Sequence, residues 1–462
     1  MSRNPMAKHQ SSRATITRFY SQGGKFELEL LGAPQILMNK RASKRCRRLG
    51  GNAVKRRTFL SAAAMMCLPA GVAYAEPKTV KVWHVFNLET DMIYGGIKAF
   101  NESQSDYRID ARIVPGTEVV TELIKATATG SVPDLVTLDN PVVASFSAQG
   151  TLTDLTDLVA QSKLIKPDLY FPGPWAAGTW KGRTYGVPRD ANTLALYYNA
   201  DMFRAKGLDP DQPPKTWAEL KTAAEKLRDA DKGVYGFGFC ALQAEEGVFQ
   251  WLPFLTQAGG SVDKLDQPEA TTALQYWVDM VKNGVASRDV INQRQYEVIN
   301  TFMAGNTAIA LGGPWELPRM QKEAKFDWRL TLLPVKEDKN IKASALGGYI
   351  FVSPKGAKQV EGAFRFIELM SDPRFLNEGW KTGRLAPRSD VVVENPQWPE
   401  AYSIYREQMQ SARQRGPHPR WPEISRAIQM AMQEAITGTK PADVALKDAA
   451  GKIQPILAKT PL

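Results

Sequence analysis

The sequence has few of the side chains that build disulfide and metal sites. Its 462 residues include three cysteines and three histidines. Beyond residue 75 only Cys240, His84 and His418 remain, so no internal disulfide can form there. An ordinary zinc site needs four ligands rich in Cys and His, and these three residues do not supply them. We therefore expect a protein without a metal or covalent cofactor.

Several catalytic signatures are also missing. The sequence contains no glycine-rich phosphate loop and no G-x-S-x-G turn. A Ser-His-Asp arrangement would have to use His84 or His418. Paired carboxylates, as in glycoside hydrolysis, stay open because acidic residues are numerous.

Positive charge is concentrated at the start of the chain. Residues 1–57 hold 14 of the 59 Lys and Arg but only two of the 48 Asp and Glu. The remaining 45 bases and 46 acids give the rest of the chain a net charge of −1. The overall charge of +11 therefore does not indicate a nucleic-acid partner, and we expect none.

Residues 55–75 have the three parts of an export signal. Lys55-Arg56-Arg57-Thr58-Phe59-Leu60 is followed by an apolar stretch through Leu68 and by Ala73-Tyr74-Ala75. This pattern predicts cleavage after Ala75, and the paired arginines resemble a twin-arginine signal. The apolar stretch is about half the roughly 20 residues that span a bilayer, which disfavours the alternative of a retained anchor. We expect a leader over 1–75, with the true translation start open within 1–54.

Strand and helix patterns alternate after the leader. Val80 to Trp83, Ile109 to Val114 and Leu135 to Leu138 read as strands, with helical patterns between them. This β-α-β-α-β opening predicts an α/β fold with a mostly parallel sheet. Farther on, Thr216-Trp217-Ala218-Glu219 predicts a helix start with a capping box. The part after residue 75 is long enough for two lobes with separate cores.

A set of motifs in a fixed order carries a family resemblance. They are Pro133-Asp134-Leu135-Val136, Tyr185-Gly186-Val187-Pro188, Tyr197-Tyr198-Asn199-Ala200-Asp201, Phe302-Met303-Ala304-Gly305-Asn306, Gly313-Pro314-Trp315 and Thr382-Gly383-Arg384-Leu385-Ala386-Pro387. Residues 78–462 thereby resemble the extracellular solute-binding proteins of the maltose-binding type, which serve sugar ABC transporters. The resemblance implies a two-lobed periplasmic-binding-protein fold with a hinge and a ligand cleft between the lobes. It assigns residues 78–188 and 347–385 to lobe I, and residues 189–346 and 386–462 to lobe II. Chain crossings are expected near Val187 to Asp190 and Leu346 to Tyr349.

The resemblance also implies which residues bind ligand. A sugar needs polar side chains for its hydroxyls and aromatic rings for its C–H faces. The expected binding residues are His84, Asn87, Glu89, Asp139, Asn140, Asp190, Asn192, Trp251, Trp315, Gly348, Tyr349 and Arg384. Trp315 leads this set because it follows Gly313-Pro314 at the end of an apolar strand. Core packing is the competing role for both tryptophans, and a helix N-cap is the competing role for Asp139.

Arginine and tryptophan neighbours of this set are further candidates. Arg189 would place a positive charge at the cleft edge, and Arg388 and Trp421 would lie nearby. The first loop lacks the acidic-lysine pair of the maltose binder, so maltose itself is not expected. Because several candidates are arginines, an anionic sugar, a sulfonated or phosphorylated glycoside, or a uronide stays open beside a neutral sugar.

The expected function is the periplasmic capture of a sugar or glycoside for the permease subunits of an ABC importer, without catalysis and as a monomer. One alternative keeps the fold but binds a non-sugar solute such as a polyol, a glycerol phosphodiester or a peptide. A remoter alternative is a secreted carbohydrate-active enzyme.

Overall fold

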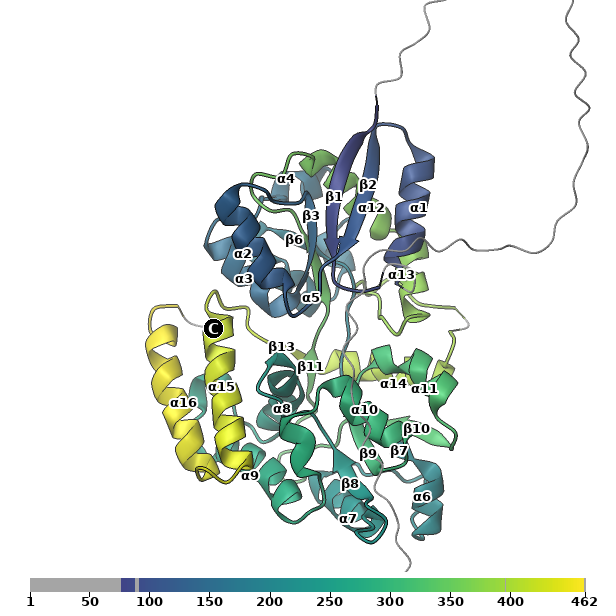
Figure 1. The fold of residues 1–462 in the computed structure, drawn as a ribbon, viewed down its shortest axis with the longest axis vertical. Coiled ribbons are helices and arrows are strands. Elements are labelled where there is room, and N and C mark those ends of the chain that lie inside the picture. Colours follow the sequence, from purple (N-terminus) through teal and green to yellow (C-terminus); the bar gives the residue numbers. More distant parts are fainter. Residues whose placement is uncertain (1–75, 88–90, 395, 461–462) are drawn as a thin grey trace, which may run out of the picture. The chain divides into compact units, whose positions relative to one another are not determined.

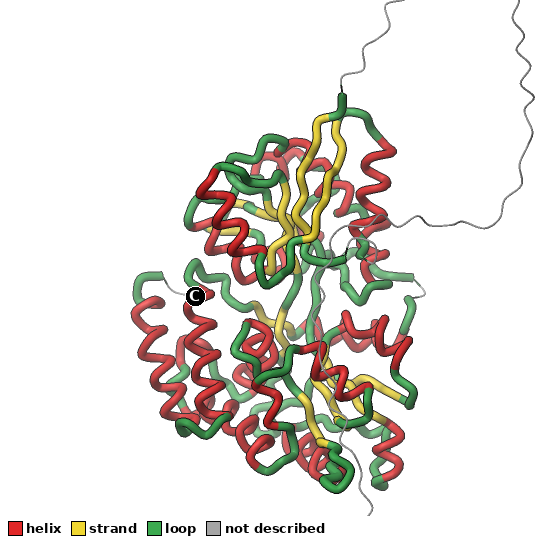
Figure 2. Tube along the Cα trace, in the orientation of Figure 1, coloured by secondary structure: helices red, strands yellow, loops and turns green. Residues whose placement is uncertain are grey.

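The computed structural model describes residues 76–87, 91–394 and 396–460. The described residues all belong to one compact unit. Two β-sheets carry the fold, each with helices packed against it (Figures 1 and 2). The predicted signal over residues 55–75 and the candidate Glu89 lie outside the described residues. In the described part of the chain, no helix is both long and apolar enough to cross a membrane.

The first sheet has five strands in the order β2-β1-β3-β12-β6. Its strands are β1 (Lys78–His84), β2 (Tyr107–Ile113), β3 (Leu135–Asp139), β6 (Gly186–Pro188) and β12 (Tyr349–Val352). β1 pairs in parallel with both β2 and β3, as the β-α-β-α-β pattern predicts. β12 pairs antiparallel with β3 and β6, so the distant end of the chain completes the sheet.

Helices cover both faces of the first sheet because its strands alternate their apolar side chains. Val80 and Val82 of β1 join one buried cluster, and Trp83 between His84 and Val82 joins the other. In β12 the same alternation places Phe351 in the first of these clusters and its two chain neighbours in the second. The helices around this sheet are α1 (Ile93–Ser103), α2 (Val119–Thr129), α3 (Asn140–Ala148), α4 (Thr156–Gln161), α5 (Pro172–Ala177), α12 (Val360–Met370) and α13 (Pro373–Trp380).

The second sheet has four strands in the order β10-β7-β9-β8. Its strands are β7 (Ala195–Asn199), β8 (Tyr235–Gly238), β9 (Thr307–Gly312) and β10 (Trp328–Thr331). β7 runs antiparallel to both β9 and β10, and only the β8–β9 pair is parallel. The expectation of a mostly parallel sheet therefore holds for the chain's opening and fails for this sheet.

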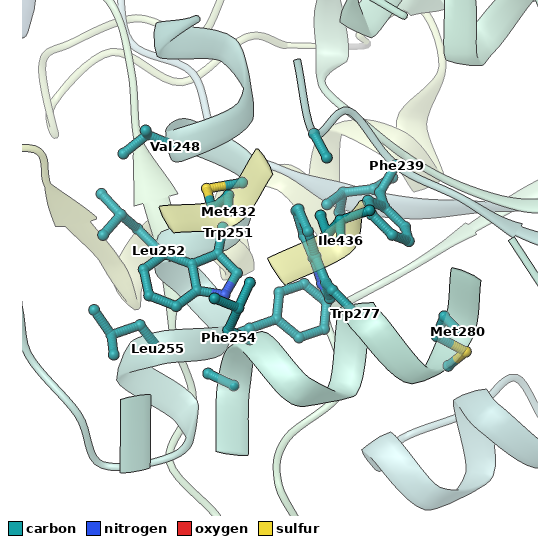
Figure 3. Close-up of a cluster of buried hydrophobic side chains, with 14 of the residues drawn as sticks. Phe239, Val248, Trp251, Leu252, Phe254, Leu255, Trp277, Met280, Met432 and Ile436 are labelled. Atoms are coloured by element: carbon teal, nitrogen blue, oxygen red, sulfur yellow. The ribbon is translucent and has the colours of Figure 1, made fainter. Parts of the chain in front are cut away.

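Two groups of helices pack against the second sheet. The larger cluster unites α7 (Trp217–Leu227), α8 (Glu245–Gln257), α9 (Pro268–Lys282), α15 (Trp421–Ile436) and α16 (Ala442–Leu457). The opposite face carries α10 (Gln295–Met303), α11 (Leu317–Glu323) and α14 (Pro399–Gln410), and α6 (Ala200–Ala205) follows β7. The predicted capping box opens α7, where the Glu219 amide donates to Thr216 Oγ1 over 3.2 Å. Figure 3 shows the centre of the larger cluster, where Trp251 and Trp277 are fully buried beside Phe254.

Three segments cross between the two sheets, and they bond to one another. The Asn192 and Gly347 amides donate to each other's carbonyls over 3.0 and 2.9 Å. Ala191 and Leu385 exchange a second pair of main-chain hydrogen bonds. Short strands β11 (Ser344–Leu346) and β13 (Ala412–Gln414) pair in parallel beside these crossings. The crossings expected near residues 187–190 and 346–349 are therefore present, with a third segment bonded to them.

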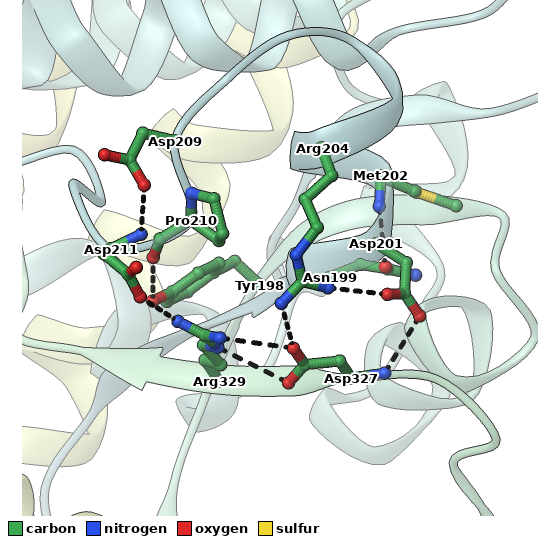
Figure 4. A network of polar contacts seen from close by, with 10 residues as sticks. All are labelled: Tyr198, Asn199, Asp201, Met202, Arg204, Asp209, Pro210, Asp211, Asp327 and Arg329. Carbon is green, nitrogen blue, oxygen red and sulfur yellow. Dashed lines mark hydrogen bonds and ion pairs between the residues drawn. The ribbon is translucent and has the colours of Figure 1, made fainter.

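The outer edge of the second sheet carries charge rather than apolar surface. Figure 4 shows Arg329 of β10 and Arg204 of α6 converging on Asp327. Arg204 donates to Asp327 over 2.5 Å and to Asp201 over 2.8 Å. These exposed ion pairs add little stability each, but charge on an edge strand opposes edge-to-edge association.

Candidate functional site

A cavity of about 480 Å³ opens where both sheets and the crossing segments meet. Asp139 ends β3, Tyr349 begins β12, and Trp315 follows β9 across the cavity. Open α/β sheets bind ligands beyond the carboxyl ends of their strands, and this cavity has that position. Its lining residues are Phe86, Asp139, Asn192, Glu245, Glu246, Phe249, Arg294, Gln295, Tyr296, Trp315, Glu316, Gly347, Gly348, Tyr349, Arg384 and Arg415.

Six of the twelve residues expected from the sequence line this cavity. They are Asp139, Asn192, Trp315, Gly348, Tyr349 and Arg384. Asn140 lies behind the wall, where its side-chain oxygen accepts from Arg415 Nη2 over 2.7 Å. Asn87 is exposed beside the loop after β1 and is not among the lining residues, and Glu89 lies outside the described residues.

Gly348 illustrates why this wall needs glycine. Its φ of 140° lies in a region that L residues rarely adopt. A Cβ atom there would also meet the Asp190 carbonyl oxygen at 2.5 Å. Glycine lets the two crossing segments approach closely at the floor of the cavity.

The expected role of Trp251 in ligand binding must be corrected, because the structure places its side chain in the core. Its side chain is fully buried within the larger cluster of the second sheet (Figure 3). Glu245 and Phe249 of the same helix face the cavity instead. Residues four apart share one face of a helix, and residue 251, two positions beyond Phe249, points away from that face.

The expected cleft positions of His84, Asp190 and Arg189 must also be corrected. These three residues form a buried network beneath the cavity. Arg189 donates to both Asp91 and Asp190, and all of these side chains are almost fully inaccessible. His84 Nδ1 lies 3.1 Å from Thr137 Oγ1, and its Nε2 lies 3.4 Å from Asp91 Oδ1. None of the three is among the residues that line the cavity.

Burial and the neighbouring side chains determine the protonation states of His84 and Asp91. Burial lowers the pKa of His84 below its usual 6.5, so the ring is neutral at neutral pH. Burial opposes the ionisation of Asp91, but the charge of Arg189 and the hydrogen bonds from His84 and Arg189 together outweigh it and hold the Asp91 pKa well below 3.8. Asp190 Oδ1 accepts from the Tyr349 amide over 3.0 Å, so the network joins both crossings. We assign these residues to positioning the backbone under the cavity.

Arg415, which the sequence did not single out, organises the polar floor of the cavity. Its guanidinium donates to both oxygens of Asp139 over 2.9 and 3.1 Å, and to Glu245 Oε1 over 3.1 Å. It also lies 4.7 Å from the centre of the Phe249 ring. Asp139 also caps α3, which is the alternative role expected for it from the sequence, and it lines the cavity at the same time.

Glu245 is held by residues behind the wall. The Trp421 indole donates to its Oε1 over 3.0 Å, and the Ser425 hydroxyl donates to its Oε2 over 2.5 Å. Burial raises the pKa of Glu245 above 4.5, although the Arg415 charge opposes this. Trp421 thus orients a lining carboxyl without lining the cavity itself. Arg388, the other neighbouring candidate, is buried against Asp390 and the Ser371 carbonyl.

Aromatic rings supply the apolar walls. Phe86 packs edge-on against Tyr349 with centroids 4.7 Å apart, and Phe249 lies 6.3 Å from Trp315. Tyr296 at the start of α10 is exposed at the rim. Rings beside carboxyl and guanidinium groups can hold a molecule that has both C–H faces and hydroxyls. No cluster of three His, Cys, Asp or Glu side chains that could hold a metal occurs among the described residues.

A sequence profile described as bacterial extracellular solute-binding protein matches residues 96–405. The match spans well over half of the chain. The chain is a bacterial extracellular solute-binding protein. Membership in this family identifies it as a binding protein rather than an enzyme, so the alternative of a carbohydrate-active enzyme is dropped.

Known relatives and solved structures agree with this membership. The solute-binding protein is 26% identical over 351 residues to the sn-glycerol-3-phosphate-binding periplasmic protein UgpB of Salmonella typhimurium, covering 71% of this chain and 76% of UgpB. It is 27% identical to an ABC transporter solute-binding protein of Thermotoga lettingae bound with alpha-D-tagatose, with a TM-score of 0.74 over 82% of this chain and all of that one. The cyclic alpha-maltosyl-1,6-maltose binding protein of Arthrobacter globiformis is also 27% identical, with a TM-score of 0.71 over 83% of this chain and all of its own. The family and the two-lobed α/β fold expected from the sequence are thus confirmed.

Proposed function

We propose that this solute-binding protein captures a sugar or small glycoside in the cavity and delivers it to the permease subunits of an ABC importer. The observation that carries the proposal is the cavity of about 480 Å³ with aromatic walls and a carboxyl-rich floor. This volume falls in the range of about 300–1,000 Å³ that is typical of small-molecule sites. The sugars named for the Thermotoga and Arthrobacter proteins support the same class of ligand.

Each proposed contact has a chemical role. Asp139 and Glu245 offer carboxyl oxygens to ligand hydroxyls, and Asn192 offers an amide. Trp315 and Phe249 form an apolar wall on the second lobe, while Phe86 and Tyr349 face it from the first. Because the two walls belong to different lobes, we propose that ligand closes them by bending the crossing segments. The lobe limits at residues 188 and 346, and a further change of lobe at residue 385, remain part of this proposal.

Export belongs to the same proposal. The signal predicted over residues 55–75 would carry the protein to the periplasm by the twin-arginine route, with cleavage after Ala75. The periplasmic location in the name of the Salmonella relative supports that destination. We propose that the exported protein acts as a monomer.

A thermal-shift screen against neutral sugars, polyols and sugar acids tests the ligand class. A specific ligand at 100 times its dissociation constant adds about 2.7 kcal/mol of stability. A clear rise of the melting temperature with a sugar or glycoside, and none with amino acids or peptides, is the expected result. Stabilisation by a peptide alone would contradict the proposal. The name of UgpB keeps glycerol phosphates as a second class to include in the screen.

A further inference from the structure

Three arginines line the cavity, and two of them already have carboxylate partners. Arg415 is paired with Asp139 and Glu245. Arg294 donates to Glu246 over 2.9 Å through Nε and 2.5 Å through Nη2. Arg384 makes no ion pair and no side-chain hydrogen bond with any residue that the structure describes. Among the described residues, its charge is therefore uncompensated by direct contact.

Two aromatic rings contact the Arg384 guanidinium, and these contacts do not occupy its N–H groups. Its guanidinium carbon lies 4.3 Å from the centre of the Phe86 ring and 5.9 Å from that of Tyr349. A guanidinium over a ring keeps its N–H groups directed outward in its own plane. These N–H groups match the paired oxygens of a carboxylate or a phosphate.

The turn before Arg384 fixes where the side chain begins. Gly383 has a φ of 71°, and a Cβ there would lie 1.9 Å from the Pro314 carbonyl oxygen. The turn therefore sits directly against the backbone that carries Trp315. Arg384 is thus placed on the first lobe's wall, next to the aromatic wall of the second lobe.

A carboxyl on the second lobe's wall does not take the role of partner. Glu316 lies within ion-pair distance of Arg319, with Nε and Oε2 3.6 Å apart. Its other oxygen, Oε1, is buried without a hydrogen-bond partner. Burial raises the pKa of Glu316 above 4.5, although the charges of Arg319 and Arg384 oppose this. No carboxylate among the described residues forms an ion pair with Arg384, so its N–H groups can receive an acidic group that enters the cavity.

We infer that the ligand of this solute-binding protein carries an acidic group, a carboxylate or a phosphate ester, and that Arg384 receives it. The inference rests on the proposed function and specifies its ligand class. Closure of the lobes around a neutral ligand would bury an unpaired guanidinium, which is costly. An acidic group would form a two-pronged, charge-assisted pair with the same side chain.

Calorimetric titration with matched ligand pairs tests the inference on protein expressed from the complete sequence. The pairs are glucose with glucuronate, glucose with glucose 6-phosphate, and glycerol with sn-glycerol 3-phosphate. In at least one pair the acidic member should bind about tenfold tighter or more, and the advantage should shrink as salt is raised. The first two pairs separate a preference for carboxylate from one for phosphate.

Two variants assign the effect to this residue. Arg384→Gln should remove the advantage of the acidic member over its neutral partner. Arg374→Gln is the matched control, since Arg374 is exposed on α13 and paired with Asp372. It should keep the preference unchanged. Circular dichroism and melting curves should show both variants folded, because the Arg384 side chain forms no hydrogen bond with the residues that the structure describes.

The outcomes are distinct. A preference that Arg384→Gln abolishes and Arg374→Gln retains supports the inference. Neutral sugars that bind as tightly as their acidic partners would overturn it and leave the proposed function standing. An acidic preference that survives in Arg384→Gln would show that another residue receives the group. If neither sugars nor any member of the pairs bind, the proposed function falls together with the inference.

Discussion

Replacing Arg415 by alanine should destabilise the protein and remove the positive charge that holds the Asp139 and Glu245 carboxyl groups in the cavity floor. The side chain is 4% exposed and donates four hydrogen bonds, two to Asp139, one to Asn140 and one to Glu245. Removing one member of a fully buried ion pair costs about 3–5 kcal/mol. Here the Asp139 and Glu245 side chains are 34% and 29% exposed, so water can partly replace the guanidinium. We expect a loss of about 2–3 kcal/mol at neutral pH.

The loss should depend on pH in one direction. The Arg415 charge opposes the raised pKa of Glu245, so its removal should raise that pKa further. A carboxyl whose pKa is higher in the folded state stabilises the fold below its unfolded pKa, and this contribution disappears as pH rises through the folded pKa. The deficit of Arg415→Ala relative to the parent should therefore be larger at pH 7.5 than at pH 5.

Urea denaturation at the two pH values, followed by calorimetric titration with a ligand found in the screen, measures both effects. Arg415→Lys should recover only part of the stability, because an ammonium group cannot reach four acceptor oxygens on three residues of two lobes. Arg374→Ala, on the surface, should match the parent. If Arg415→Ala is as stable as Arg374→Ala at both pH values and binds ligand normally, the proposed floor of the cavity is wrong.

Two further predictions rest on the structure, and a third rests on the sequence of the predicted signal. Trp251→Ala should cost about 3–5 kcal/mol in urea denaturation, whereas Trp315→Ala should cost about 1–2 kcal/mol and lower ligand affinity at least about tenfold; normal binding by Trp315→Ala would contradict its assigned role. The pKa of Glu316 is raised by burial, so the stability of Glu316→Gln relative to the parent should increase from pH 5 to pH 8, and a constant difference would refute this. Replacing Arg56 and Arg57 together by lysine should leave precursor in the cytoplasm, and normal periplasmic accumulation on fractionation would exclude the twin-arginine route.

Local signals explain what could be predicted from the sequence. The capping box at Thr216 and Glu219 involves residues three apart, and the structure contains it. The three opening strands alternate with helical patterns, and their parallel pairing follows from that alternation. The glycine and proline before Trp315 mark a turn at the end of a strand, and the indole does line the cavity.

Long-range pairing explains what could not be predicted. Arg415 meets Asp139 across 276 positions of the chain, and neither short segment shows that the other lies beside it. Arg189 carries a charge and resembled a cleft or surface residue, yet two carboxylates allow its complete burial. Helix α8 lines the cavity, but the Trp251 side chain lies on its other face, because the sequence does not reveal how α8 is rotated relative to the cavity.

The hydrogen bonds among the crossing segments limit how the two sheets can move. Any change of the angle between them must bend the segments around Ala191, Gly347 and Leu385 together, since each is tied to a neighbour through its main chain. Independent twisting of one segment would break those bonds. Opening and closing should therefore follow a single coordinate. One pair of spectroscopic labels, placed on exposed residues of the two lobes, should be enough to record the whole motion in real time.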